Sequence, residues 1–333
     1  MPTLRPKTLL MWAAAVMLTL VLHTPLHAQT CLGAADMDAA SRTALTDTGQ
    51  RFFGMVSSGD VVALRLNTIA SLAANYAGIE AAVKDNQPTL SGGKATVRPP
   101  FLLKMEANGS GERAEFLCGV FGANGQTADS TVFVIPNLPP GNYAVVILDV
   151  GTGKGPYTVS FVLQQEGGVW KLGGYYVKAV QSKGHDGLWF SEQAKQFKAK
   201  GQMHNAWFYN LQAREMLVPV PFMSTQMTDR LYDEYQSVKP ADLPPFDLTI
   251  PGKTVRVTNL FPLTVGTDLD VVAKYQTESV ADTGKTFQDN VAVMKALLVK
   301  FPELRDAFDG VVARGVETSG RDYGTLLPMK DIH

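Results

Sequence analysis

The chain has 333 residues, of which 45% are hydrophobic and 18% are charged, and its formal net charge is -1. This composition is typical of a folded globular protein and excludes a largely disordered chain, and the length allows two or three compact units. A chain without a surplus of positive charge is poorly suited to a phosphate backbone, so the composition argues against a nucleic-acid-binding protein.

The first 28 residues have the pattern of an export signal. Arg5 and Lys7 precede an apolar run over residues 9–22, which is shorter than the roughly 20 residues that a membrane-spanning helix needs. Pro25 follows the run, and residues 26–28 form an imperfect cleavage site. We therefore expect cleavage near Ala28 and a periplasmic or secreted mature protein without a membrane span. An uncleaved N-terminal anchor is the alternative.

The sequence contains two cysteines, Cys31 and Cys118. In an exported protein an even number of cysteines favours a disulfide, which here would tie the mature N-terminus to a strand far along the chain. Two independent thiols are the alternative, and the sequence does not decide between them.

Residues 29–182 predict helices followed by strands. Apolar periodicity predicts helices over 37–57, 61–74 and 79–84, and a loop over 88–93. Alternating runs between Gly- and Pro-rich turns predict strands over 95–97, 101–107, 114–121, 132–135, 143–150, 157–164 and 169–180. Gly173-Gly174 predicts a bulge in the last strand. We expect an α+β unit in which helices precede a curved antiparallel meander.

This order of elements is similar to that of the nuclear transport factor 2-like superfamily, which includes SnoaL-like proteins. The resemblance covers residues 36–180, and it rests on the Ser58-Gly59-Asp60 turn between the first helices and on the closing hairpin with Trp170-Lys171-Leu172. It implies a cone-like domain whose interior holds a small ligand, carries an acid–base residue or is filled with side chains.

The cone implied by this resemblance offers three residues as candidates to line a ligand pocket: Trp170, Tyr175 and Tyr176. Strand alternation must turn one of the two tyrosines away from the interior. The superfamily's usual His and Asp dyads have no counterpart here, because no histidine lies between His27 and His185.

Residues 183–238 predict a helical connector. Phe190, Ala194 and Phe197 share one face of its first helix and resemble the pattern of a single tetratricopeptide unit. The second helix is apolar on almost every side, so we expect it to be packed between the first helix and a third helix over 225–238, with Trp207 and Tyr209 buried. One unit does not make a binding array, and we interpret the pair as internal architecture.

Residues 239–245 form a Pro-rich linker, and residues 246–333 predict a small α+β domain. Its expected elements are strands over 253–258, 261–265 and 269–276, a helix over 282–300, and closing strands over 310–317 and 323–328. No family resemblance was found for this unit.

The sequence presents few candidates for catalysis. The Gly-rich run at 151–155 lacks the Ser or Thr and the helix that follow a phosphate-binding lysine, so we interpret it as a hairpin turn. His185-Asp186, with His204 nearby in the sequence, could form an acid–base pair, but adjacent His and Asp in a Gly-rich connection are more commonly turn and capping residues. The His and Cys residues do not have metal-ligand spacing. The charged group Asp306, Asp309, Arg321 and Asp322 reads as solvated surface.

Two functional hypotheses follow. The first is an exported, non-catalytic binding or scaffolding protein of the bacterial envelope or exterior, with an envelope protein or a small ligand as its partner and no cofactor. The second is a small-ligand-binding or SnoaL-like enzyme that uses a pocket inside the cone. Enzymatic activity therefore stays open, and the scarcity of catalytic candidates favours the first hypothesis.

Overall fold

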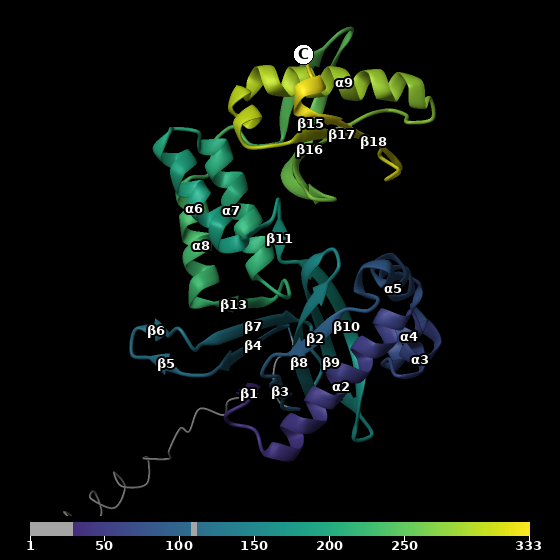
Figure 1. Ribbon diagram of the computed structural model, residues 1–333, viewed down its shortest axis with the longest axis vertical. Coiled ribbons are helices and arrows are strands. Elements are labelled where there is room, and N and C mark those ends of the chain that lie inside the picture. Colours follow the sequence, from purple (N-terminus) through teal and green to yellow (C-terminus); the bar gives the residue numbers. More distant parts are fainter. Residues whose placement is uncertain (1–28, 108–111) are drawn as a thin grey trace, which may run out of the picture.

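The computed structural model describes residues 29–107 and 112–333. The predicted export signal and its cleavage site lie outside the described residues. Figure 1 shows an N-terminal unit of sheets and helices, a central group of helices and a C-terminal sheet with one long helix, arranged along the long axis. The predicted α+β class is confirmed. Within the described ranges, no helix is both long enough and apolar enough to cross a bilayer.

A curved antiparallel main sheet forms the centre of the N-terminal unit. Its strands follow the order β1 (Gln29–Leu32), β3 (Phe101–Met105), β8 (Gly141–Thr152), β9 (Gly155–Glu166) and β10 (Val169–Ala179), and β2 (Lys94–Val97) pairs with β8. The register of β10 against β9 shifts between Leu172 and Gly174, which confirms the predicted bulge. The Gly-rich run at 151–155 is the β8–β9 hairpin turn, as expected.

A second sheet consists of β4 (Arg113–Cys118), β7 (Thr131–Pro136) and β13 (Met223–Thr225), and the short strands β5 (Phe121–Gly122) and β6 (Gly125–Gln126) form a separate hairpin. The prediction of a single meander is therefore wrong. The buried Phe116 and Phe133 of the second sheet pack with Val145 and Ile147 of β8 in a core of their own. Because these apolar side chains are buried against β8, strands β4 and β7 pack on one face of the main sheet and do not extend it.

Helices cover the other face of the main sheet: α2 (Ala39–Ser58), α3 (Val61–Leu66), α4 (Ala70–Ala74) and α5 (Ala77–Leu90). The single helix predicted over 61–74 is wrong. Leu172 of β10 donates to the Asn67 carbonyl at 2.8 Å and accepts from the Ile69 amide at 3.0 Å, and this bridge interrupts the helix. The loop predicted over 88–93 is also wrong for residues 88–90, because α5 continues to Leu90, which is fully buried.

A disulfide joins Cys31 of β1 to Cys118 of β4, with the two Cα atoms 5.1 Å apart and 87 positions between them in the sequence. It connects an edge of the main sheet to the second sheet, and Cys118 lies in the core between them. Of the two alternatives that the sequence left open, the structure therefore has the paired form.

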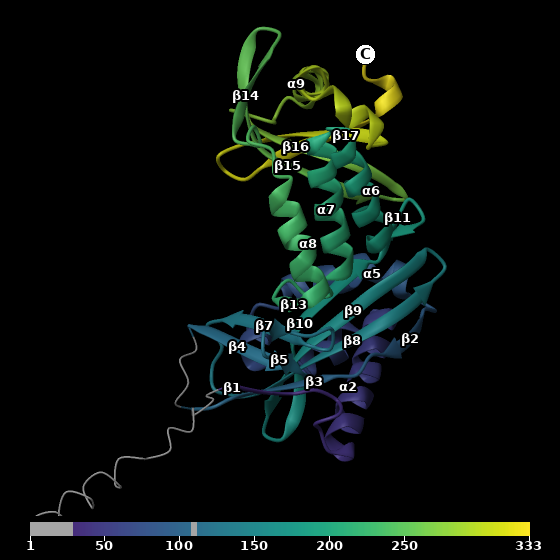
Figure 2. The ribbon, with the colours of Figure 1, turned by 90° about the vertical axis from the view of Figure 1, so that its left-hand side faces the viewer.

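The central helices are α6 (Gly187–Ala199), α7 (Met203–Leu217) and α8 (Gln226–Ser237), and the hairpin of β11 (Gln181–Ser182) and β12 (His185–Asp186) leads into them. Figures 1 and 2 show the three helices standing side by side, and α7 contacts both of the others. Trp207 and Tyr209 of α7 are only 7% and 4% exposed, as expected.

The C-terminal sheet has the order β14 (Phe246–Ile250), β15 (Lys253–Val265), β16 (Asp268–Gln276), β17 (Gly310–Val316) and β18 (Asp322–Pro328). The strands predicted at 253–258 and 261–265 are one strand, whose register shifts between Val257 and Asn259. Strand β14 was not predicted. Helix α9 (Thr283–Lys300) and the 3-10 turn η1 (Pro302–Asp306) connect β16 to β17, which pair in parallel, and η2 (Met329–Asp331) follows β18.

The central helices are tied to both units. Phe190, Trp207 and Tyr209 belong to the same buried core as the C-terminal sheet and α9. At the other end, β13 pairs with β7 of the second sheet, and Lys178 of β10 lies 2.6 Å from Glu215 of α7. The helices therefore share the C-terminal core and join it to the N-terminal unit.

Candidate functional site

The three residues predicted to line a pocket in the cone lie on both faces of the main sheet. Trp170 and Tyr175 pack into the core beneath the helices, whereas Tyr176 packs against the core on the side of the second sheet. The Phe161 ring stacks on Tyr175 at 5.8 Å between centroids, so apolar side chains fill the space beside it. The Tyr175 hydroxyl is buried without a hydrogen-bond partner in the described chain, and burial raises its pKa above the ordinary value.

Asp186 and His185 have the structural roles expected of a turn. The Asp186 carboxylate accepts a hydrogen bond from the Trp189 amide at 2.9 Å and caps α6. The His185 ring stacks on Trp189, with centroids 3.8 Å apart and planes 6° apart. The structure does not bring His204 to this pair, since His204 lies at the opposite end of the helical hairpin.

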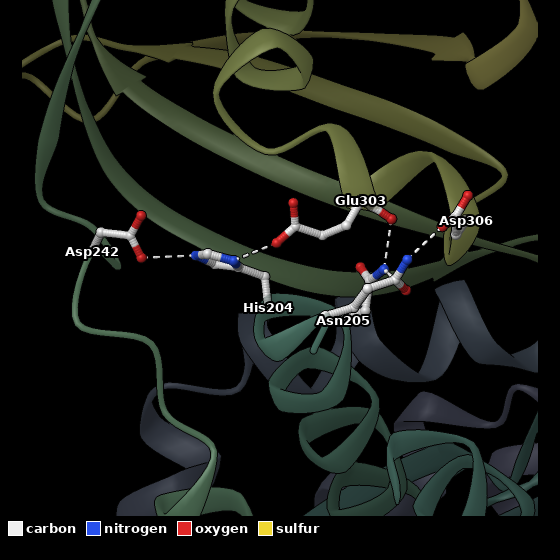
Figure 3. Close-up of polar contacts among 6 residues, drawn as sticks. His204, Asn205, Asp242, Glu303 and Asp306 are labelled. Atoms are coloured by element: carbon white, nitrogen blue, oxygen red, sulfur yellow. Dashed lines mark hydrogen bonds and ion pairs between the residues drawn. The ribbon is translucent and has the colours of Figure 1, made fainter. Parts of the chain in front are cut away.

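His204 lies between two carboxylates, as Figure 3 shows. Its Nδ1 is 2.7 Å from Glu303 Oε1 and its Nε2 is 2.8 Å from Asp242 Oδ1. The two carboxylates therefore occupy the positions at both ring nitrogens where a substrate could otherwise form a hydrogen bond. The Asn205 amide donates to the Glu303 carbonyl oxygen beside them. We interpret this cluster as a structural contact that holds the start of α7 against the linker and η1.

The charged group predicted in the C-terminal unit does not form one cluster. Asp306 accepts a hydrogen bond from Gln202, Asp309 pairs with Lys183 at 2.8 Å, and Asp322 pairs with Arg314 at 2.7 Å. Across the described residues, His, Cys, Asp and Glu side chains do not gather in groups of three or more that could hold a metal ion.

A C-terminal pocket of about 510 Å³ opens where β16 ends and α9 begins. Its walls come from the start of β15, from the segment after β16 and from the first turns of α9, and they include Lys253, Thr254, Thr277, Glu278, Lys285 and Asp289. Because β16 and β17 are parallel and α9 crosses between them, the carboxyl end of β16 and the start of α9 lie at the same edge of the sheet. Ligands of sheets with parallel strands bind at this kind of edge.

The charges of the C-terminal pocket are of two kinds. Lys253 Nζ lies 2.6 Å from Asp289 Oδ2, and because both side chains are partly shielded from solvent, each neutralises the other within the wall. Glu278 after β16 and Lys285 on α9 have no charged partner among the described residues. Asp282 also lines the pocket, where its carboxylate accepts from the Lys285 backbone amide and caps α9. The remaining two charges, Glu278 and Lys285, are of opposite sign and come from different walls, which suits a ligand that carries both charges. The Thr254 and Thr277 hydroxyls add groups that can donate or accept hydrogen bonds.

Sequence reasoning missed this pocket, although a signal for it was present. The predicted order was a strand over 269–276, a helix over 282–300 and a strand over 310–317. A parallel pair of strands needs a crossover connection, and a single helix between two strands is its usual form, so this order favours a parallel pair. The rule for the carboxyl ends of parallel strands would then have pointed to the segment around Glu278 and Lys285.

Comparison with known proteins provides no relative from which a role can be transferred. No family model matches the chain, and neither the curated proteins nor the solved structures contain a match. The proposals below therefore rest on the residues and geometry of this chain.

Proposed function

We propose that the protein is an exported, non-catalytic binding protein that holds a small zwitterionic molecule in the C-terminal pocket. The observation that carries this proposal is a pocket of about 510 Å³ in which Glu278 and Lys285 place unpaired opposite charges on different walls. The ammonium group of a ligand would bind Glu278 and its carboxylate would bind Lys285, and charge-assisted hydrogen bonds of this kind are the strong ones. A free α-amino acid is the smallest ligand of this class.

The arrangement of the other charges supports binding without catalysis. Lys253 and Asp289 are the least exposed charged pair of the pocket and hold each other at 2.6 Å. The Lys253 ammonium and the Asp289 carboxylate are already bound to each other. A general base, in contrast, needs a free position for the proton that it removes from a substrate.

Export is the second part of the proposal. The apolar run after Arg5 and Lys7 supports an export signal, and a disulfide such as Cys31–Cys118 persists in oxidising compartments outside the bacterial cytoplasm. N-terminal sequencing of protein recovered from the periplasm or medium should begin at or near Gln29. Recovery of the full-length chain from the membrane fraction would instead support the uncleaved anchor.

Binding is tested by isothermal titration calorimetry of the mature protein against the common L-amino acids. Glu278→Gln and Lys285→Gln should each weaken binding about tenfold, the equivalent of roughly 1.4 kcal/mol, because each removes one charged contact. Lys295→Gln is the matched control, since Lys295 is exposed on the same helix and lies outside the pocket lining. Failure of every amino acid to bind, or equal loss in the control, would refute the proposal. Recovery of chemically altered ligand would refute its non-catalytic part.

A ligand inside the N-terminal cone is the second candidate, and the buried, unpartnered Tyr175 hydroxyl favours it. This candidate follows from the resemblance of residues 36–180 to the nuclear transport factor 2-like superfamily, which we retain as a proposal. The apolar packing around Tyr175 counts against it. In the calorimetric assay, Tyr175→Phe should weaken binding if the cone is the site, and Glu278→Gln should have no effect.

A further inference from the structure

We propose a second ligand site, beyond the proposed function, between the main sheet and the central helices, for an uncharged and mainly apolar molecule with one hydrogen-bond donor. This junction pocket has a volume of about 390 Å³, and its lining includes Arg98, Thr158, Leu188, Met216, Leu217 and Met227. A volume of this size lies near the lower end of the roughly 300–1,000 Å³ typical of small-molecule sites, which also form preferentially where units meet.

Thr158 places a hydroxyl at the floor of the junction pocket. Thr158 of β9 is only 3% exposed and lines the pocket. Its hydroxyl makes no hydrogen bond to any other side chain or backbone group of the described residues. Because this oxygen is not among the fully buried polar atoms of the described chain, it is accessible at the pocket surface, where a donor on a bound ligand can form the hydrogen bond that the protein does not supply.

The charges around Thr158 are compensated within the protein. Its cross-strand neighbours are Asp149 on β8 and Lys178 on β10, and neighbours in register share one face of the sheet. Arg98 binds Asp149 through two contacts, of 3.0 Å and 2.6 Å, and Lys178 pairs with Glu215 at 2.6 Å. Asp186 also lines the pocket, and its carboxylate accepts a hydrogen bond from the Trp189 amide. Because these charged groups already have partners in the protein, the pocket favours an uncharged ligand over an ion.

The opposite wall of the junction pocket is apolar and adaptable. Leu188 of α6, Met216 and Leu217 of α7 and Met227 of α8 supply it. Methionine side chains are flexible and polarisable, so they adjust to the outline of an apolar molecule. Leu188 is 55% exposed and Met227 is 43% exposed, which leaves apolar surface at the pocket available for contact.

The experiment uses N-phenyl-1-naphthylamine, an uncharged fluorescent probe with a single N–H donor, titrated into the mature protein. We expect saturable binding of one equivalent, with at least a tenfold loss of affinity in Leu188→Trp, which fills the pocket from an exposed position. Met227→Trp fills it from α8 and should have the same effect. Circular dichroism and the thermal midpoint of each variant establish that it is folded.

A matched control separates the junction pocket from another apolar surface. Residues of α3–α5 line a groove of about 660 Å³ that includes the exposed Val62 and Leu66. Leu66→Ser should leave probe binding unchanged. Binding that is not saturable, that survives both tryptophan substitutions or that is lost in Leu66→Ser overturns the site.

The role of Thr158 is tested with a second probe. In 1-benzylnaphthalene a CH₂ group replaces the N–H, and its affinity is measured by displacement of the first probe. Thr158→Val should weaken the amine about three- to tenfold and leave the hydrocarbon unchanged. Equal effects on both probes, or none on the amine, overturn the hydrogen bond to Thr158. Amino-acid binding at the C-terminal pocket should be the same in all these variants.

Discussion

Asp270 has a carboxyl group whose pKa is changed by its buried environment. It lies near the start of β16 and is only 2% exposed. Burial is the main cause that raises the pKa of Asp270 to about 6, and the neighbouring Asp268 and Asp309 add to the effect, while Lys183 opposes it. The folded protein therefore keeps a proton on Asp270 at a pH where the unfolded chain, with an ordinary aspartate pKa near 3.8, has lost it.

Asp270→Asn tests this pKa. As the pH rises from about 4 to about 7, the folded parent must ionise a buried carboxyl, so Asp270 should lower the free energy of unfolding by at most about 3 kcal/mol. The variant cannot ionise, so it should match the parent near pH 4 and be more stable by about 2 kcal/mol at pH 7. Urea unfolding at several pH values measures the difference. The exposed Asp233→Asn on α8 is the control, because Asp233 is not among the charges that act on Asp270. An equal gain in both variants would contradict the assignment.

At the scale of the element, Gly187 permits the close packing of the helical hairpin. A Cβ atom at this position would lie 2.6 Å from Leu217 Cγ and 2.8 Å from the Ala213 carbonyl oxygen. Both distances are too short for a real contact, so the first turn of α6 approaches the last turn of α7 only because residue 187 has no side chain. Asp186 and Gly187 thus set where the first helix begins and how closely it packs.

Gly187→Ala should lower the free energy of unfolding by about 1–3 kcal/mol, because the added methyl group forces the two helices apart. Gly78→Ala is the matched control, since residue 78 is also helical and a Cβ there meets no atom within 4 Å. The control should be neutral or more stable by up to about 1 kcal/mol. Chemical denaturation compares the two, and similar stability of both variants would show that the hairpin tolerates the extra atom.

At the scale of the whole molecule, the central helices are part of the C-terminal fold. Phe190, Trp207 and Tyr209 lie in one core with Val271 of β16 and Leu297 of α9. The Tyr209 hydroxyl donates to the Ala307 carbonyl oxygen at 2.6 Å, where it is buried, which adds a polar contact to this core. A C-terminal fragment without these helices would expose much of the apolar face that they cover.

We therefore expect a fragment of residues 183–333 to fold, and a fragment of residues 246–333 to lack cooperative unfolding, because the shorter fragment loses the helical side of its core. Circular dichroism with thermal melting distinguishes the two. The prediction fails if residues 246–333 alone melt cooperatively at a midpoint equal to that of the longer fragment.

Much of the local structure could be predicted from sequence, because it depends on neighbours along the chain. The apolar stripe of Phe190, Ala194 and Phe197 identified α6, and the two-sided apolarity around Trp207 identified α7 as a buried helix. The bulge at Gly173-Gly174 was likewise visible as a break in a strand pattern. The C-terminal pocket was missed because Lys253, Glu278 and Lys285 come from three segments that meet only in the folded unit.

By itself, the sequence determined the α+β class, the helical hairpin and the burial of Trp207 and Tyr209, since periodicity and glycine placement act over a few residues. Only the tertiary structure decided which strands share a sheet, where the helix over 61–74 breaks, and that Cys31 meets Cys118. It also decided that β16 and β17 pair in parallel. These features depend on contacts between segments far apart in the chain, whose pairing local patterns do not specify.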